Sequence, residues 1–292
     1  QIMAMIASSE RKPSLSPAID SIAKLNLETV LSGEAILANL PTTRRVGSKP
    51  LSVEALVASG PGSAYGKDKG MWEFPQANGR YKAMQMGVQL ANRTGALHEI
   101  EFSEFVSKVQ SVSEALGAEP EFADMMAEVA RARKLDQFAS THDAHLSLYI
   151  FSNRVAWSLG YLMQVATKLG FVPGSVPGRL VLPSNQGQAP YFSLDFDPQV
   201  ALTPDLEGTG LKQFKLSLEV PQVARENNPF DLMRDYANTL AKEMDARVAD
   251  ENGEAVFDET LNQIGQELQA LYDRLDEEGL SAGSPLAKRL FS

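Results

Sequence analysis

The stretch LKQFKLSLEVPQVARENNPFDLMRDYANTLAKEMDA, residues Leu211–Ala246, decides the fold because a strand pattern passes directly into a helix pattern. Phe214, Leu216 and Leu218 recur with the period of two that marks one face of a half-buried strand. The apolar positions that follow keep helical spacing, and they are Phe230, Met233, Leu240 and Met244. The stretch therefore predicts a strand followed by an amphipathic helix.

The same pattern occurs earlier in the chain, between Met84 and Ala118, where Phe102 lies 128 positions before Phe230. At this offset the apolar strand and helix positions correspond in phase, and they are Met86, Val88, Leu90, Phe102, Phe105, Val112 and Leu116. One supersecondary unit is therefore expected twice. We predict an α+β protein of two tandem split β-α-β, ferredoxin-like units, each an antiparallel sheet with helices on one face. The predicted domains are residues 1–140 and 141–292.

Composition excludes several classes of protein. The 37 acidic and 27 basic residues give a net charge of −10, which disfavours binding to nucleic acid or to an anionic membrane surface. The chain has no cysteine, so disulfides, thiolate metal sites and a cysteine nucleophile are excluded. No apolar run reaches the ~18 residues of a membrane span. The chain begins at Gln1 rather than Met, and we expect an anchor or targeting segment to lie outside it.

Turn residues, local charge and position in the chain give four further expectations. Trp72–Phe74 and Tyr81–Asn92 are expected to form a hairpin across Asn78-Gly79. The glycine-rich residues Ser59–Gly70 read as a loop without the spacing of a phosphate cradle. Arg44, Arg45 and Lys49 are the densest positive cluster, expected in a solvated loop or, alternatively, at a contact for an acidic partner. The tail Gly283–Ser292 is expected to be loosely held.

Chemistry-bearing residues are sparse. His142, Asp143 and His145 suggest a metal site. A strand is expected to start here, however, so a spacing of three places His142 and His145 on opposite faces, and His98 is remote in sequence. Neighbouring carboxylates such as Asp195 and Asp197 are typical of a solvated strand. The sequence therefore predicts no catalytic residue, no metal and no cofactor. Trp157 and Tyr161 are expected in the core of a helix spanning Val155–Gly170.

Residues His145–Leu275 resemble the C-terminal domain of ZipA, a family of bacterial division proteins. The motifs that carry the resemblance are FSL at Phe192–Leu194, DP at Asp197-Pro198, LEVPQ at Leu218–Gln222, the helix Phe230–Met244, and the acidic hairpin and last helix at Val248–Leu275. The resemblance implies that the unit binds the C-terminal tail of FtsZ in a hydrophobic cleft on the sheet face away from the helices. The first unit is then expected to be a divergent copy, which departs from the single-domain family pattern.

Strand alternation departs from that hydrophobic cleft. It places Phe192, Leu194, Phe196, Leu216 and Leu218 in the core, and polar residues at the open face. The expected partner-binding residues are Tyr149, Phe151, Tyr191, Ser193, Asp195, Lys215 and Ser217 in the second unit, and Gln85 and Gly87 in the first. An apolar tail gains about 25 cal/mol per Å² only from apolar area that it covers, so Tyr149, Phe151 and Tyr191 would have to supply it. Alternatively, the two sheets pair edge to edge as a composite platform.

The predicted function is that of a non-catalytic adaptor of bacterial division. Its expected partner is the FtsZ tail or another division protein, at the cytoplasmic side of the inner membrane. The alternative is a small-ligand sensor that uses the junction between duplicated βαβ units, which rests on fold analogy alone. A deep junction pocket with convergent polar groups would favour the sensor, and a shallow open sheet face would favour the adaptor.

Overall fold

The computed structural model describes residues 14–58, 70–185, 187–203, 208 and 210–292. The chain divides into two compact units, residues 1–140 with Ser292, and residues 141–291. Each unit combines helices with an antiparallel sheet, so the α+β class is confirmed. Most of the loop predicted at Ser59–Gly70 lies outside the described residues.

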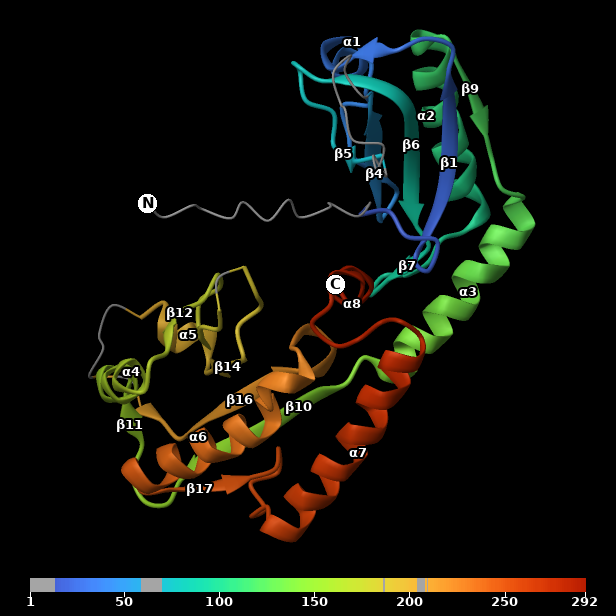
Figure 1. Ribbon diagram of the computed structural model, residues 1–292. Coiled ribbons are helices and arrows are strands. Elements are labelled where there is room, and N and C mark those ends of the chain that lie inside the picture. The colour runs from blue at the N-terminus through green and yellow to red at the C-terminus, as the bar shows by residue number, and fades with distance from the viewer. Residues whose placement is uncertain (1–13, 59–69, 186, 204–207, 209) are drawn as a thin grey trace, which may run out of the picture. The chain divides into compact units, whose positions relative to one another are not determined.

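The first unit is built on a sheet with the strand order β3-β4-β6-β1-β9 (Figure 1). Its main strands are β1 (Asp20–Leu27), β3 (Arg45–Val46), β4 (Lys49–Val57), β6 (Arg80–Gln89) and β9 (Ala118–Glu121). Four two-residue strands accompany them, β2 (Leu31–Ser32), β5 (Trp72–Glu73), β7 (Ala91–Asn92) and β8 (Gly95–Ala96). The helices are α1 (Gly33–Ala38), α2 (Glu99–Leu116) and α3 (Met125–His142). Because β1 is antiparallel to both β6 and β9, these two strands run parallel on either side of it.

Helix α2 supplies the core of the first unit and lies along one face of the sheet (Figure 1). His98 caps its first turn by accepting a hydrogen bond from the Glu101 backbone, and Glu101 returns the contact in a capping box. Gly117 ends it in the left-handed conformation, with φ of 62°. The buried α2 side chains pack with the strand positions of the repeat, and the cluster includes Phe102, Phe105, Val109, Val112, Met84, Met86 and Val88.

The second unit has the strand order β12-β13-β14-β16-β10-β17. Its strands are β10 (His145–Ser152), β11 (Trp157–Ser158), β12 (Val172–Pro173), β13 (Arg179–Leu182), β14 (Phe192–Asp195), β15 (Gly210–Leu211), β16 (Gln213–Glu219) and β17 (Ala246–Ala249). The α-helices are α4 (Leu159–Lys168), α5 (Pro198–Ala201), α6 (Pro229–Glu243), α7 (Asp258–Glu277) and α8 (Pro285–Leu290). Two short 3₁₀ helices, η1 (Val220–Gln222) and η2 (Arg225–Asn227), lie before α6.

Helix α6 covers the face formed by β10, β16 and β17 (Figure 1). Its stripe and the alternating β16 positions are buried against each other, and they are Phe230, Met233, Ala237, Leu240, Phe214, Leu216 and Leu218. β10 is antiparallel to both β16 and β17, as β1 is to β6 and β9. The offset of 128 positions carries β9 at Ala118–Glu121 onto β17 at Ala246–Ala249. In both units, therefore, the first long strand lies between two strands and is antiparallel to both.

Two predictions about the first unit are corrected. β5 pairs with β4 rather than with β6, with Trp72 opposite Leu56. Tyr81 is fully buried, and its hydroxyl accepts from the Gln76 backbone and donates to Glu73. These bonds hold the intervening turn against β6 and prevent a simple hairpin. Arg44 and Arg45 are exposed, as expected of a solvated loop, but Arg45–Val46 pairs with β4 and Lys49 is buried.

Three predictions about the second unit are also corrected. Helix α4 begins at Leu159 rather than at Val155, which is 73% exposed. Trp157 is buried as expected, and its Nε1 donates to the Met244 carbonyl at 2.9 Å, but Tyr161 is 38% exposed. Phe196, expected in the core, is half-buried.

The C-terminal tail is not loosely held. It forms α8, whose first turn is capped by the Ser284 side chain. Phe291 is 1% exposed, and Gln222 Nε2 donates to its carbonyl at 2.6 Å. The tail is rich in small and basic residues, and only its few apolar residues reach the core. Its sequence therefore did not predict α8.

Replacing Tyr272 by phenylalanine is expected to raise the free energy of unfolding by about 1 kcal/mol. The Tyr272 hydroxyl of α7 is buried and has no hydrogen-bond partner among the residues that the structure describes, and such a group costs desolvation energy that phenylalanine avoids. Burial also raises the pKa of Tyr272 from 10.0 to about 12. The folded state therefore retains this proton more tightly, so the wild type should lose stability relative to Tyr272→Phe as the pH rises above 10. Urea unfolding at pH 7 and above pH 10 measures both effects; a destabilised variant at pH 7 would contradict the first.

Candidate interaction surface

The sheet face of the second unit opposite α6 is polar. Residues directly opposite one another in antiparallel strands point to the same side, so the pairing defines two rows across this face. One row contains Ser147, Ser217 and Ser193 from β10, β16 and β14. The next contains Tyr149, Lys215, Asp195 and Arg179, ending on β13. We call these two rows the open face of the second unit.

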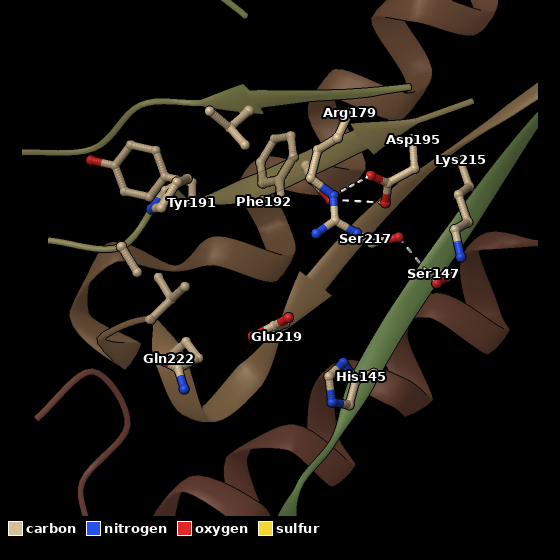
Figure 2. A pocket seen from close by; sticks show the side chains of 15 residues that line it. His145, Ser147, Arg179, Tyr191, Phe192, Asp195, Lys215, Ser217, Glu219 and Gln222 are labelled. Atoms are coloured by element: carbon tan, nitrogen blue, oxygen red, sulfur yellow. Dashed lines mark hydrogen bonds and ion pairs between the residues drawn. The ribbon is translucent and has the colours of Figure 1, made fainter. Parts of the chain in front are cut away.

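The charges on the open face are only partly compensated. Arg179 Nε lies 2.7 Å from Asp195 Oδ1, and the Ser193 hydroxyl donates to the other oxygen of Asp195 at 2.9 Å (Figure 2). The Lys215 side chain forms no ion pair or hydrogen bond with any described residue. The open face therefore offers one available ammonium group beside a neutral hydroxyl row.

A shallow hollow of about 340 Å³ lies on this face. Five of the predicted residues line it: Tyr191, Ser193, Asp195, Lys215 and Ser217. The prediction omitted His145, Ser147, Arg179, Glu219 and Gln222, which also line it (Figure 2). Alternation along β10 could have found His145 and Ser147, because both share the parity of Tyr149. Arg179 required the β13–β14 pairing, which the sequence does not specify.

Tyr149 and Phe151 lie outside this hollow, further along β10. Their rings contact each other with centroids 6.3 Å apart, and the Arg247 guanidinium lies 5.4 Å from the Phe151 centroid. Both side chains are half-buried. They extend the open face with an aromatic region rather than lining the same hollow as Tyr191.

The two residues predicted in the first unit have different environments. Gln85 is half-buried on β6 and donates to Glu54 at 2.9 Å. Gly87 is buried beneath Leu15, and a Cβ at Gly87 would lie 2.3 Å from Leu15 Cδ2. Leu15 therefore covers Gly87 in this conformation, so Gly87 has little surface with which to contact a partner.

The histidines do not form a metal centre within the described residues. His145 Nε2 lies 3.3 Å from Asp143, and His142 Nδ1 lies 2.9 Å from the Thr141 hydroxyl. No group of three potential ligands that could hold a metal occurs in the described part of the chain. Among the helices that the structure describes, none has the length and apolar character to cross a membrane.

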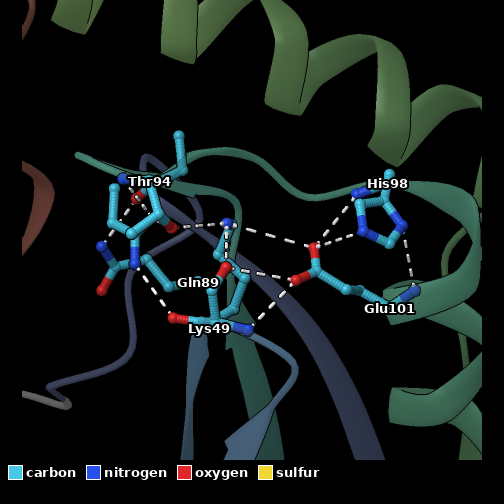
Figure 3. A network of polar contacts seen from close by, with 8 residues as sticks. Lys49, Gln89, Thr94, His98 and Glu101 are labelled. Carbon is cyan, nitrogen blue, oxygen red and sulfur yellow. Dashed lines mark hydrogen bonds and ion pairs between the residues drawn. The ribbon is translucent and has the colours of Figure 1, made fainter.

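A second polar cluster lies inside the first unit. Lys49 is 1% exposed, with its Nζ 2.7 Å from the Ser48 hydroxyl and 4.0 Å from Glu101 Oε2 (Figure 3). Burial lowers the pKa of Lys49 from 10.5, and the negative charge of Glu101 opposes this shift. The Glu101 carboxylate also accepts hydrogen bonds from the backbone N–H groups of Ser48 and His98. The cluster therefore connects the turn before β4 to the first turn of α2.

The second unit has the features of a protein-interaction domain, with helices on one side of an antiparallel sheet and a shallow polar surface on the other. Residues 161–267 match the family model of ZipA, C-terminal FtsZ-binding domain. Residues 161–267 of the second unit are therefore similar to this family, and the resemblance drawn from the sequence is confirmed. The family is one of cell-division domains that bind FtsZ without catalysis. No curated protein matches the chain.

Proposed function

We propose that the chain is a non-catalytic adaptor of bacterial cell division that docks the FtsZ C-terminal tail, or another division protein, on the open face of the second unit. The observation that carries this proposal is the match of residues 161–267 to an FtsZ-binding domain. The sheet face opposite α6 supports it, because an open antiparallel face can accept an extended or helical segment. We place its action at the cytoplasmic side of the inner membrane at the division site, as the family suggests.

We also propose that the two units are tandem copies of one split β-α-β arrangement. Two observations support this. In each unit a strand, a helix and a second strand follow in sequence, and the two strands flank the first long strand of the unit. The buried Phe102 and Phe230 take equivalent positions in α2 and α6. The first unit would then be the divergent copy.

The open face favours a mixed mode of binding. The row of Ser147, Ser217 and Ser193 can accept and donate hydrogen bonds to a peptide backbone. Lys215 can pair with a carboxylate of the partner. Val181 and Tyr191, at the β13–β14 side of the hollow, supply the apolar contact. Tyr149 and Phe151 add an aromatic region beside Lys215.

Reversing the charge of Lys215 tests this surface. Lys215→Glu is expected to weaken binding of a synthetic FtsZ C-terminal peptide at least about fivefold, because it removes an attraction of about 1 kcal/mol and adds a repulsion. Lys242→Glu makes the same charge change on the exposed surface of α6 and should leave the affinity unchanged. Titration of the labelled full chain by NMR measures both. Shifts should appear at Tyr149 and Ser217; their absence at millimolar peptide would exclude the FtsZ tail as the partner of this face.

A further inference from the structure

The helix side of the second unit carries a groove of about 440 Å³ between the start of α6 and the middle of α7. Its floor is apolar, because Phe230 and Leu268 line it and are themselves buried. A Cβ at Gly265 of α7 would lie 3.8 Å from the Phe230 ring, so the glycine leaves space beside this ring. The groove shares no lining residue with the hollow on the open face, so it is a separate surface.

The first turn of α6 has free backbone donors at this groove. Its N-cap residue, Asn228, has φ of 45° and makes no side-chain capping bond. Leu232 is the first helical residue whose N–H bonds to the backbone, at 3.1 Å from the Asn228 carbonyl. The N–H groups of Phe230 and Asp231 therefore have no partner in the part of the chain that the structure describes. Both residues line the groove, and such a helix N-terminus favours a negatively charged group.

A buried hydroxyl is a second and independent feature of the groove. Tyr272 lines it from α7 and is 3% exposed, and its hydroxyl has no hydrogen-bond partner among the described residues. Burial raises the pKa of Tyr272 to about 12, and the charges of Arg225, Asp231 and Glu226 also act on it. The hydroxyl therefore lies toward η2 and the first turn of α6. A ligand that accepts a hydrogen bond from it would remove the cost of burying it unpaired.

Two arginines line the groove, and their charges are compensated to different degrees. Arg225 lies 2.8 Å from each of two carboxylates of α7, which neutralise it. Arg234 donates to the neutral amide of Asn262 at 3.0 Å, and its only carboxylate neighbour among the described residues is Asp258, at 3.6 Å and with a side chain that is 84% exposed. Its guanidinium carbon lies 6.0 Å from the Phe230 ring centroid, above the first turn of α6. Arg234 therefore keeps N–H donors and most of its charge for a ligand.

We propose that this groove binds an oxyanion, the charged group of a carboxylate or phosphate ligand. The anion accepts hydrogen bonds from the free N–H groups of the first turn of α6, from the Tyr272 hydroxyl and from Arg234. Asp231 also lines the groove, but it is exposed, so solvent screens its repulsion. The site goes beyond the proposed function because it takes a different ligand on a different surface. It also accounts for a buried hydroxyl that otherwise only destabilises the fold.

The test is a titration of the ¹⁵N-labelled full chain with sodium phosphate and, separately, with sodium acetate, with sodium chloride added to keep the ionic strength constant. We expect the amide signals of Phe230 and Asp231 to shift and to saturate with at least one of the two anions. The anion that binds more tightly distinguishes a phosphate ligand from a carboxylate ligand. Sodium chloride alone should not reproduce the shifts.

Variants identify the donors. Arg234→Gln is expected to weaken binding about tenfold, because it removes a charged hydrogen bond. The matched control is Arg274→Gln, an exposed arginine of α7 that does not line the groove, and it should leave the affinity unchanged. Asp231→Asn should strengthen binding about threefold, because it removes a repulsion at a partly solvated site.

Tyr272→Phe separates a ligand contact from a structural role. This variant is expected to weaken binding about fivefold although it stabilises the fold, so its two effects have opposite signs. A tyrosine with a structural role alone would change the stability and leave the affinity as it is.

Three results would overturn the inference. The first is the absence of a saturable shift at Phe230 and Asp231 with either anion, and the second is the same shift with sodium chloride alone. The third is an unchanged affinity in both Arg234→Gln and Tyr272→Phe. None of these results bears on the open face, so the proposed function can stand or fall separately.

Discussion

Replacing Phe214 by alanine is expected to lower the free energy of unfolding of the second unit by about 3–5 kcal/mol. Phe214 is 2% exposed and lies on the β16 face that α6 covers. Its ring contacts Trp157 with centroids 5.6 Å apart, so truncation removes apolar burial and leaves a cavity beside a rigid aromatic neighbour. Urea unfolding monitored by fluorescence, in a Trp72→Phe background that leaves Trp157 as the reporter, measures the loss.

The control is the next residue on the same strand. Lys215 points to the opposite, open face, so Lys215→Ala should change the free energy of unfolding by less than about 0.5 kcal/mol. If Lys215→Ala were as destabilising as Phe214→Ala, the polar side of the sheet would be packed rather than open. A packed face could not dock a partner, so the proposal that the open face of the second unit binds one would then lose its structural basis.

The second large effect is expected for Glu101→Gln in the first unit. This change removes the carboxylate next to Lys49, and leaving a buried charge without its partner costs about 3 kcal/mol. Lys49 and Glu101 have side-chain exposures of only 2% and 7%. Unfolding followed through Trp72, in a Trp157→Phe background, reports on this unit.

The double variant Lys49→Met with Glu101→Gln separates the cause. Removing both charges should recover most of the stability, since an apolar replacement of a buried pair is often neutral. A double variant that is as unstable as Glu101→Gln would show that Glu101 acts mainly through its bonds to Ser48 and His98.

The pH dependence provides a further check. Because burial lowers the pKa of Lys49 from 10.5, the unfolded chain binds this proton more tightly than the folded chain. In the window below pH 10.5 and above the lowered pKa, stability should rise with pH, and Lys49→Met should lose this rise. Burial raises the pKa values of Tyr81 and Tyr272, which lowers the stability as the pH rises. Both the wild type and Lys49→Met have these tyrosines, so comparing the two proteins removes this effect.

The sequence was sufficient to predict elements that have a strong local pattern. The apolar alternation at Phe214, Leu216 and Leu218 predicts a strand that the structure forms, and the helical stripe from Phe230 to Met244 predicts α6. Each of these predictions succeeds because side-chain periodicity reflects which face of an element is buried, and burial dominates the energetics.

Predictions failed where a distant part of the chain decides the outcome. The sequence places Lys49 in a solvated basic cluster, but in the folded unit the first turn of α2 places Glu101 beside it. Gly87 looks like an open position on a strand until Leu15, which is remote in sequence, covers it. Phe291 looks like part of a loose tail until η1 supplies Gln222.

The candidate site was predictable only in part for the same reason. Alternation assigns Lys215 and Ser217 to the open face, because each strand has only two sides. Which strands lie next to each other depends on pairing across loops, so Arg179 beside Asp195 follows only from the folded sheet.

By itself, the sequence determined a strand followed by a helix in each unit, the buried side of each, and the similarity of residues 161–267 to the ZipA C-terminal domain. Only the tertiary structure decided which polar residues meet on the open face and that Lys49 is buried. The physical reason is the distance along the chain over which each feature is set. Periodicity depends on neighbouring residues, whereas strand pairing and packing join segments that are far apart in the sequence, and a local pattern does not show which segments will meet.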